Sequence, residues 1–86
     1  MPIVFIPPQM RDLTRGAEQV TAEGANLRDV LWALDREFPG LFYRVVAGEA
    51  IAPGLAVSVD GSMTTRLLTQ VRPESEIHFL PAIGGG

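Results

Sequence analysis

Three consecutive glycines, Gly84, Gly85 and Gly86, carry the clearest chemical signal in this 86-residue sequence. A glycine has no Cβ, so a run of glycines passes through a channel that is too narrow for side chains. The same property lets the groups of a partner enzyme approach a terminal carboxylate closely. We therefore predict that Gly86 is the reacting residue and that Gly84 and Gly85 form the arm that delivers it. The alternative is an inert tail.

The other side chains predict no catalytic site within the chain itself. There is no cysteine, and the single histidine, His78, falls in the middle of an expected strand. A histidine without a neighbouring nucleophile is a poor catalytic base, and we expect its imidazole on the solvent face of that strand. The carboxylates show no metal-ligand spacing, and the close pair Glu74 and Glu76 is typical of a polar turn. We therefore expect a protein that is not an enzyme and that binds no metal or cofactor.

The charge pattern argues against polyanionic partners. The net charge is −3, and the seven basic residues, all arginine, are interspersed with ten acidic residues. Such a chain has no excess of positive charge to neutralise phosphates, so we expect no binding to nucleic acid or to a membrane surface. The first ten residues lack the basic start of a signal peptide, and Pro7 and Pro8 interrupt their apolar run. We therefore expect these residues to belong to the folded domain. Because the chain has no cysteine, and so no disulfide framework, we expect a cytoplasmic protein.

A folded body must position the glycine arm, and local patterns indicate its first elements. A β-branched and aromatic run from Ile3 to Ile6 predicts a short strand that ends at two prolines. Weak polar–apolar alternation predicts a second, partly exposed strand over residues 17–22. Asn26 is a typical N-cap for the helix that follows, which ends at a Pro-Gly pair. The apolar stripe of this helix consists of Leu27, Val30, Leu31, Leu34 and Phe38.

The second half of the chain predicts further strands around a hairpin. Residues 41–54 break the pattern, and we expect a loop there. Residues 55–59 alternate and lead into Asp60-Gly61, a strong signal for a two-residue hairpin turn. A short return strand is expected over residues 63–65. Polar turn residues then precede a last strand over residues 76–80.

This order of elements favours an α+β fold, with one helix across one face of a mixed sheet of four to five strands. The β-grasp, or ubiquitin-like, arrangement fits the order well. It places the first and last strands side by side and parallel in the middle of the sheet. We therefore expect a β-grasp domain over residues 1–81 and a flexible tail over residues 82–86.

The tail requires a docking surface on the body. Pro81 favours an extended conformation at Leu80, so the chain is expected to leave the sheet straight. Ordering each tail residue in a partner costs about 1–2 kcal/mol, which contacts elsewhere must offset. An apolar patch formed by Phe5, Leu80, Pro81 and Ile83 is the expected partner-binding surface.

Residues 57–61 and 73–86, with a hairpin strand, a polar turn, a last strand, a proline and glycines, resemble the ubiquitin-like sulfur carriers of the MoaD/ThiS family. The likeness covers the whole chain. The ending Leu-Pro-Ala-Ile and the opening Phe-Ile-Pro resemble the carrier that serves cysteine synthesis more than the small subunit of molybdopterin synthase. One departure is the third glycine, since the family ends in two. We expect Gly86 to be the acceptor and Gly84 to occupy the spacer position.

The resemblance implies that an E1-like adenylyltransferase of the MoeB/ThiF type, using ATP and magnesium, adenylates Gly86. A sulfur donor would then leave a thiocarboxylate, which donates sulfur to a second enzyme. The implied acceptors are a cysteine-synthase-like enzyme, the large subunit of molybdopterin synthase or a thiazole synthase. Two alternatives stay open: a protein modifier that is conjugated to lysines, and a β-grasp interaction module with an inert tail.

Overall fold

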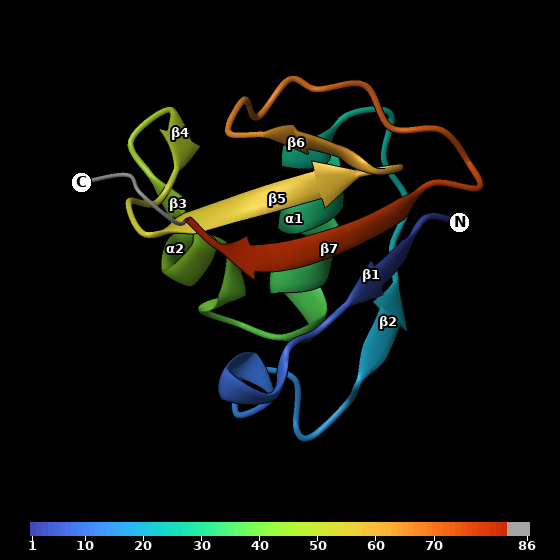
Figure 1. Ribbon diagram of the computed structural model, residues 1–86. Coiled ribbons are helices and arrows are strands. Elements are labelled where there is room, and N and C mark those ends of the chain that lie inside the picture. The colour runs from blue at the N-terminus through green and yellow to red at the C-terminus, as the bar shows by residue number, and fades with distance from the viewer. Residues whose placement is uncertain (83–86) are drawn as a thin grey trace.

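The computed structural model describes residues 1–82, whose course is drawn in Figure 1; residues 83–86 lie outside the described part. The elements are β1 (Ile3–Phe5), the 3-10 helix η1 (Pro8–Met10), β2 (Gln19–Thr21), α1 (Leu27–Glu37), α2 (Leu41–Val45), β3 (Val46–Ala47), β4 (Ala50–Ile51), β5 (Leu55–Val59), β6 (Ser62–Thr64) and β7 (Glu76–Pro81). Within residues 1–82, no helix has the length and apolar character needed to cross a membrane.

Five strands form one mixed sheet in the order β2-β1-β7-β5-β6. β1 and β7 pair in parallel, with Ile3 opposite Glu76 and Phe5 opposite His78. The other neighbours in this sheet are antiparallel. Figure 1 shows α1 behind the sheet, crossing the face that β5 and β7 turn away from the viewer. The structure therefore confirms the predicted β-grasp arrangement, including the parallel pairing of the first and last strands at its centre.

The helix α1 begins and ends where the sequence predicts. A side-chain oxygen of Asn26 accepts a hydrogen bond of 2.9 Å from the backbone N–H of Asp29, a donor that has no partner within the helix. The helix covers one face of the sheet and leaves the other face open. Its buried side chains share one core with the inward-facing strand residues: Leu27, Val30, Leu31 and Leu34 from α1, and Val4, Val57, Ile77 and Phe79 from the sheet.

Residues 41–54 do not form the loop that the sequence predicts. They contain α2 and then the short antiparallel hairpin of β3 and β4. Gly40 precedes α2 with a φ of 98°, a left-handed conformation that glycine adopts without strain. The Asp35 carboxylate accepts hydrogen bonds from the backbone N–H groups of Gly40 and Phe42, at 3.1 and 3.0 Å. The Phe42 ring also stacks on Trp32, with centroids 3.5 Å apart. Contacts with α1 therefore stabilise a helix too short to show a periodic pattern.

The hairpin of β5 and β6 forms at the predicted turn. Asp60 and Gly61 have φ values of 50° and 87°, as a two-residue turn of type I′ requires. β6 ends at Thr64, one residue before the predicted end of the return strand. β7 runs one residue beyond its predicted end, because Pro81 still lies opposite Leu55 of β5. β7 therefore has a strand on each side, β1 and β5.

Candidate functional site

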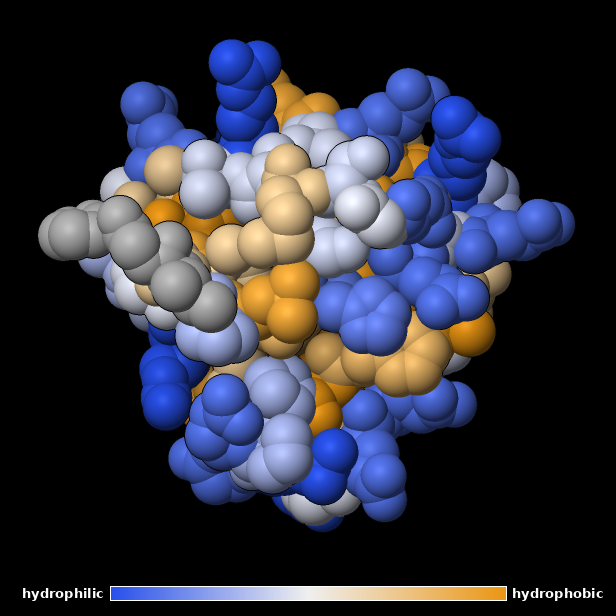
Figure 2. Space-filling model, viewed as in Figure 1, coloured by the Kyte–Doolittle hydropathy of each residue, from blue (hydrophilic) through white to orange (hydrophobic). Residues whose placement is uncertain are grey.

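The open face of the sheet carries two of the predicted docking residues. Side chains alternate along β7, so Phe79 is buried in the core while Leu80 lies on the open face and is 37% exposed. Phe5 lies on the same face, because it is opposite His78 in the parallel pair. Figure 2, which views this face, shows apolar surface over the middle of the sheet with hydrophilic side chains around it. The half-buried Phe5 and the exposed Leu80 thus lie on the same apolar face.

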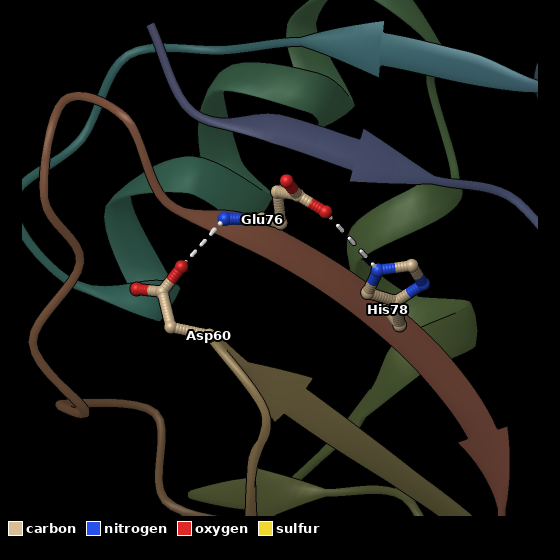
Figure 3. A network of polar contacts seen from close by, with 3 residues as sticks. All are labelled: Asp60, Glu76 and His78. Atoms are coloured by element: carbon tan, nitrogen blue, oxygen red, sulfur yellow. Dashed lines mark hydrogen bonds and ion pairs between the residues drawn. The ribbon is translucent and has the colours of Figure 1, made fainter.

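His78 extends this surface with an aromatic ring. The imidazole stacks on Phe5, with centroids 4.4 Å apart and ring planes within 4° of parallel. Its Nε2 lies 3.8 Å from a carboxylate oxygen of Glu76, as Figure 3 shows, and the side chain is 44% exposed. The structure confirms that the imidazole lies on the solvent side of the last strand. Its stacking on Phe5 was not predicted, because it depends on the register of two strands far apart in sequence.

A compact hydrogen-bond network anchors the N-terminal end of β7. The Asp60 carboxylate accepts a hydrogen bond of 2.6 Å from the Ser75 hydroxyl. It also accepts one of 2.9 Å from the backbone N–H of Glu76, as Figure 3 shows. The Asp60 N–H in turn donates to the Glu76 carbonyl at 2.9 Å. Ser75 is almost fully buried, and its hydroxyl also accepts from the backbone N–H of Arg72 at 2.8 Å. The network ties the hairpin turn of β5 and β6 to the start of the last strand.

These contacts favour the charged form of Asp60. The Ser75 hydroxyl, followed by the Glu76 backbone N–H, holds the pKa of the Asp60 carboxyl below its usual value. Burial opposes this shift but is weaker than the two hydrogen bonds, and the positive charge of Arg72, the smallest contribution, also lowers the pKa. The sequence predicts Asp60 only as a turn residue. Its second role as an anchor depends on a serine 15 positions away.

The C-terminal end of β7 is built differently. Leu80 and Pro81 lie opposite Ala56 and Leu55, and the backbone N–H of Ala82 donates to the Gly54 carbonyl at 3.1 Å. The predicted extended conformation of Leu80 is therefore present. Beside this point lies a hollow of about 260 Å³, which we name the tail-root hollow. Residues from several segments line it, among them Pro7, Met10, Arg44, Leu55, Phe79 and Pro81.

The structure separates the predicted site residues into three groups. Phe5 and Leu80 lie on the open face, and Leu80 also lines the tail-root hollow together with Pro81, one position further along the strand. Ile83 and the three glycines of the arm, residues 84–86, lie outside the described residues. Arg44 in the hollow was not predicted, because its helix was expected to be a loop. Within residues 1–82, no group of three or more histidine, aspartate and glutamate side chains is placed to hold a metal ion.

Known proteins resemble this chain over nearly its full length. The ThiS family model matches residues 4–86. No curated protein matches the chain. A chain in the crystal structure of the Amycolatopsis orientalis BexX/CysO complex is similar over 100% of both chains, with 26% identity and a TM-score of 0.90.

Two further solved structures share the fold at lower identity. The crystal structure of Mycobacterium tuberculosis CysO has 22% identity and a TM-score of 0.88, covering 96% of this chain and 100% of that one. The solution structure of small archaeal modifier protein 1 from Methanosarcina acetivorans has 21% identity and a TM-score of 0.76, covering 99% and 95%. At these identities, the similarity to the two structures shows a shared fold and no more.

Proposed function

Since this chain belongs to the ThiS family, we propose that it is a sulfur carrier whose Gly86 carboxylate is converted into a thiocarboxylate. The observation that carries the proposal is the extent of the family match, which runs through residue 86 and so includes all three glycines of the arm. The body holds the last strand at the centre of its sheet, and in the sequence only Ala82 and Ile83 separate this strand from the glycines of the arm. This arrangement suits a carrier, because it joins a reactive arm to a firmly held strand.

The first proposed step is activation by an E1-like adenylyltransferase of the MoeB/ThiF type, which uses ATP and magnesium. An oxygen of the Gly86 carboxylate attacks the α-phosphorus of ATP, pyrophosphate leaves, and an acyl adenylate forms. The terminal sulfur of a persulfide then attacks the acyl carbon and displaces AMP, which gives an acyl disulfide. A thiol cleaves the S–S bond, becomes oxidised to a disulfide, and leaves the thiocarboxylate on Gly86.

In this proposal the catalytic groups belong to the partners, and the chain itself binds no cofactor. It contributes the arm and a docking surface made of Phe5, Leu80, Pro81 and Ile83. The exposure of Leu80 on the open face and the place of Pro81 beside the tail-root hollow support this assignment. We place the reaction in the cytoplasm, where the partners find ATP and reduced thiols.

The thiocarboxylate then supplies sulfur to a second enzyme. A cysteine-synthase-like enzyme, the large subunit of molybdopterin synthase and a thiazole synthase are the candidate acceptors. The Leu-Pro-Ala-Ile ending before the glycines favours the first of these. Incubation of the loaded carrier with each acceptor and its co-substrate tests the choice, and the true acceptor alone returns the carrier to its unmodified mass.

The central experiment is intact-mass analysis after co-expression with an E1-like adenylyltransferase and a persulfide source. We expect a mass increase that corresponds to replacement of one oxygen by one sulfur, together with release of AMP in the purified reaction. A Gly86→Ala variant is the matched control, because it keeps the length of the arm and adds a single methyl group. An unchanged mass and no AMP, with an adenylyltransferase shown to be active on another carrier, would overturn the proposal.

A second candidate function is conjugation to lysines of other proteins. The similarity in fold to small archaeal modifier protein 1 favours it. The absence of lysine from this chain fits both functions, since an activated Gly86 would meet no side-chain amine on its own molecule. High-mass conjugates that disappear when Gly86 is deleted would select this function. Full activity after removal of residues 84–86 would instead select an interaction module with an inert tail.

A further inference from the structure

Two hollows flank the open face, one at each end of β7, and the charges that line them differ in sign. The acidic hollow, at the start of β7, has a volume of about 500 Å³ and is lined by Ser58, Asp60, Gly61, Glu76 and His78. The tail-root hollow lies at the other end, and Arg44 is the one charged residue of the described chain that lines it. β7 has six residues, so at about 3.3 Å per residue its ends are about 17 Å apart.

The acidic hollow keeps its negative charge at neutral pH. The contacts of Asp60 with Ser75 and Glu76 favour its ionised form, and the Glu76 side chain is 60% exposed. Arg72, the nearby cation, lines a neighbouring hollow together with Asp60 and Glu74, and its positive charge acts on Asp60. Glu76, which does not line that hollow, supplies the other negative charge of the acidic hollow. His78 is the one basic side chain that lines the acidic hollow itself within the described residues.

The tail-root hollow carries the opposite charge. Arg44 lies in the last turn of α2 and is exposed, and its guanidinium stays protonated in proteins. It forms no ion pair with a residue in the range 1–82. The rest of the lining is mostly apolar, with Leu80 shared between this hollow and the open face. A single apolar surface therefore runs from a basic end, where the tail leaves, to an acidic end.

We propose that this charge polarity orients the activating enzyme on the open face. A carboxylate side chain of the enzyme lies in the tail-root hollow beside Arg44, and a guanidinium or ammonium side chain lies in the acidic hollow beside Glu76. Apolar side chains cover the surface between them. In the reversed orientation like charges meet at both ends, which disfavours binding and turns the arm away from the enzyme's catalytic site. The inference rests on the proposed function, since it assumes that such an enzyme docks here.

The test uses two charge reversals, Arg44→Glu and Glu76→Arg, in steady-state adenylation by the E1-like adenylyltransferase from the same genome. We expect each variant to raise the KM for the carrier about tenfold at low ionic strength and to leave kcat unchanged, because the arm is intact. The effect shrinks with added salt, since exposed charges are screened. Arg36→Glu and Glu37→Arg are the matched controls, because both residues are exposed at the end of α1, away from the open face.

The two reversals also distinguish an effect of the charge polarity on KM from an effect of the net charge. Arg44→Glu makes the chain more acidic and Glu76→Arg makes it more basic, so an enzyme that responds to net charge alone shifts KM in opposite directions. Opposite shifts, or shifts equal to those of the controls, overturn the inference. Circular dichroism melting confirms that each variant folds, and the neutral variants Arg44→Gln and Glu76→Gln replace any that does not.

Failure of the proposed function gives a different result. If the wild-type chain is not adenylated at all, the proposed function falls and this inference falls with it. If the wild type is adenylated and the reversals behave like the Arg36→Glu and Glu37→Arg controls, only the inference falls.

Discussion

The two ends of β7 differ in what holds them. At the start of the strand, Asp60 and the buried Ser75 form a network of short hydrogen bonds that joins two turns. At its end, Pro81 is exposed, and within residues 1–82 one backbone hydrogen bond, from Ala82 to Gly54, follows the last strand pair. The comparison teaches that one end of the strand stabilises the fold, whereas the other end presents the surface from which the arm leaves.

The same contrast exists across the thickness of the sheet. Ile77 is fully buried against α1, while Leu80, on the opposite face of the same strand, is partly exposed. Changes on the buried side or at the start of β7 should therefore affect stability, and changes on the open side or in the arm should affect function. Each of the following experiments tests one part of this separation between positions that affect stability and positions that affect function.

The largest expected effect is on function, from deletion of Gly86. The carboxylate then lies one residue closer to the body, and we expect loading with sulfur to be abolished. The thermal unfolding midpoint should stay within about 1 °C of the wild-type value, because a change at the last position leaves the residues of the core in place. Intact-mass analysis and a melting curve measure the two outcomes. A deletion variant that is still fully loaded with sulfur would contradict the assignment of function to the arm.

The next largest effects are expected from substitutions on the two faces of β7. We expect Ile77→Ala to lower the free energy of unfolding by about 2–4 kcal/mol, since it leaves a cavity in the core. Leu80→Ala should lower it by less than about 1 kcal/mol and should instead raise the KM of adenylation, because Leu80 lies on the open face. Urea unfolding measures both variants. Equal losses of stability would show that the open face also belongs to the core.

A smaller effect is expected at the anchored end. Ser75→Ala removes a buried hydroxyl that donates to the Asp60 carboxylate and accepts from the backbone N–H of Arg72. Both groups then lose a hydrogen-bond partner. The expected loss is about 1–3 kcal/mol in the free energy of unfolding. Ser62→Ala, at an exposed position in β6, is the matched control and should change little. A loss no larger than that of the control would mean that the network contributes little to the fold.

The smallest effect is a pH dependence of stability. The pKa of Asp60 is lower in the folded chain than in the unfolded chain, so its ionised form stabilises the fold above the unfolded value of about 3.9. This contribution is lost as the pH falls through the folded value. In Asp60→Asn the group does not titrate, and the free energy of unfolding should fall less steeply below about pH 4. Urea unfolding at several pH values measures both slopes, and identical slopes would contradict the prediction.

The parts of the fold that the sequence predicts are those with local signals. Asn26 caps the helix through the backbone N–H of Asp29, three residues away, and Asp60-Gly61 defines its own turn, so both are visible in a short window. The helix α2 was missed because its support comes from Asp35 and Trp32 in another element.

The candidate site was only partly predictable for the same reason. Phe5 and Leu80 could be assigned to one surface once the first and last strands were expected to be neighbours. The stacking of Phe5 on His78, by contrast, requires the exact register of that parallel pair. The tail-root hollow requires more still, since Arg44 reaches it from a helix that has no pattern in the sequence. The features that the sequence does not predict depend on contacts between residues far apart in the chain, which residue types alone do not reveal.

The central position of β7 also determines how the domain bears mechanical load. In the proposed function an enzyme binds the chain beyond Ala82, so any load that it applies reaches the domain through the end of this strand. The backbone hydrogen bonds to β1 on one side and β5 on the other run across the axis of the strand, so a pull along that axis loads them together and not one after another. The contacts of Asp60 add resistance at the far end. A load on this end of β7 therefore acts in shear on both strand pairings at once.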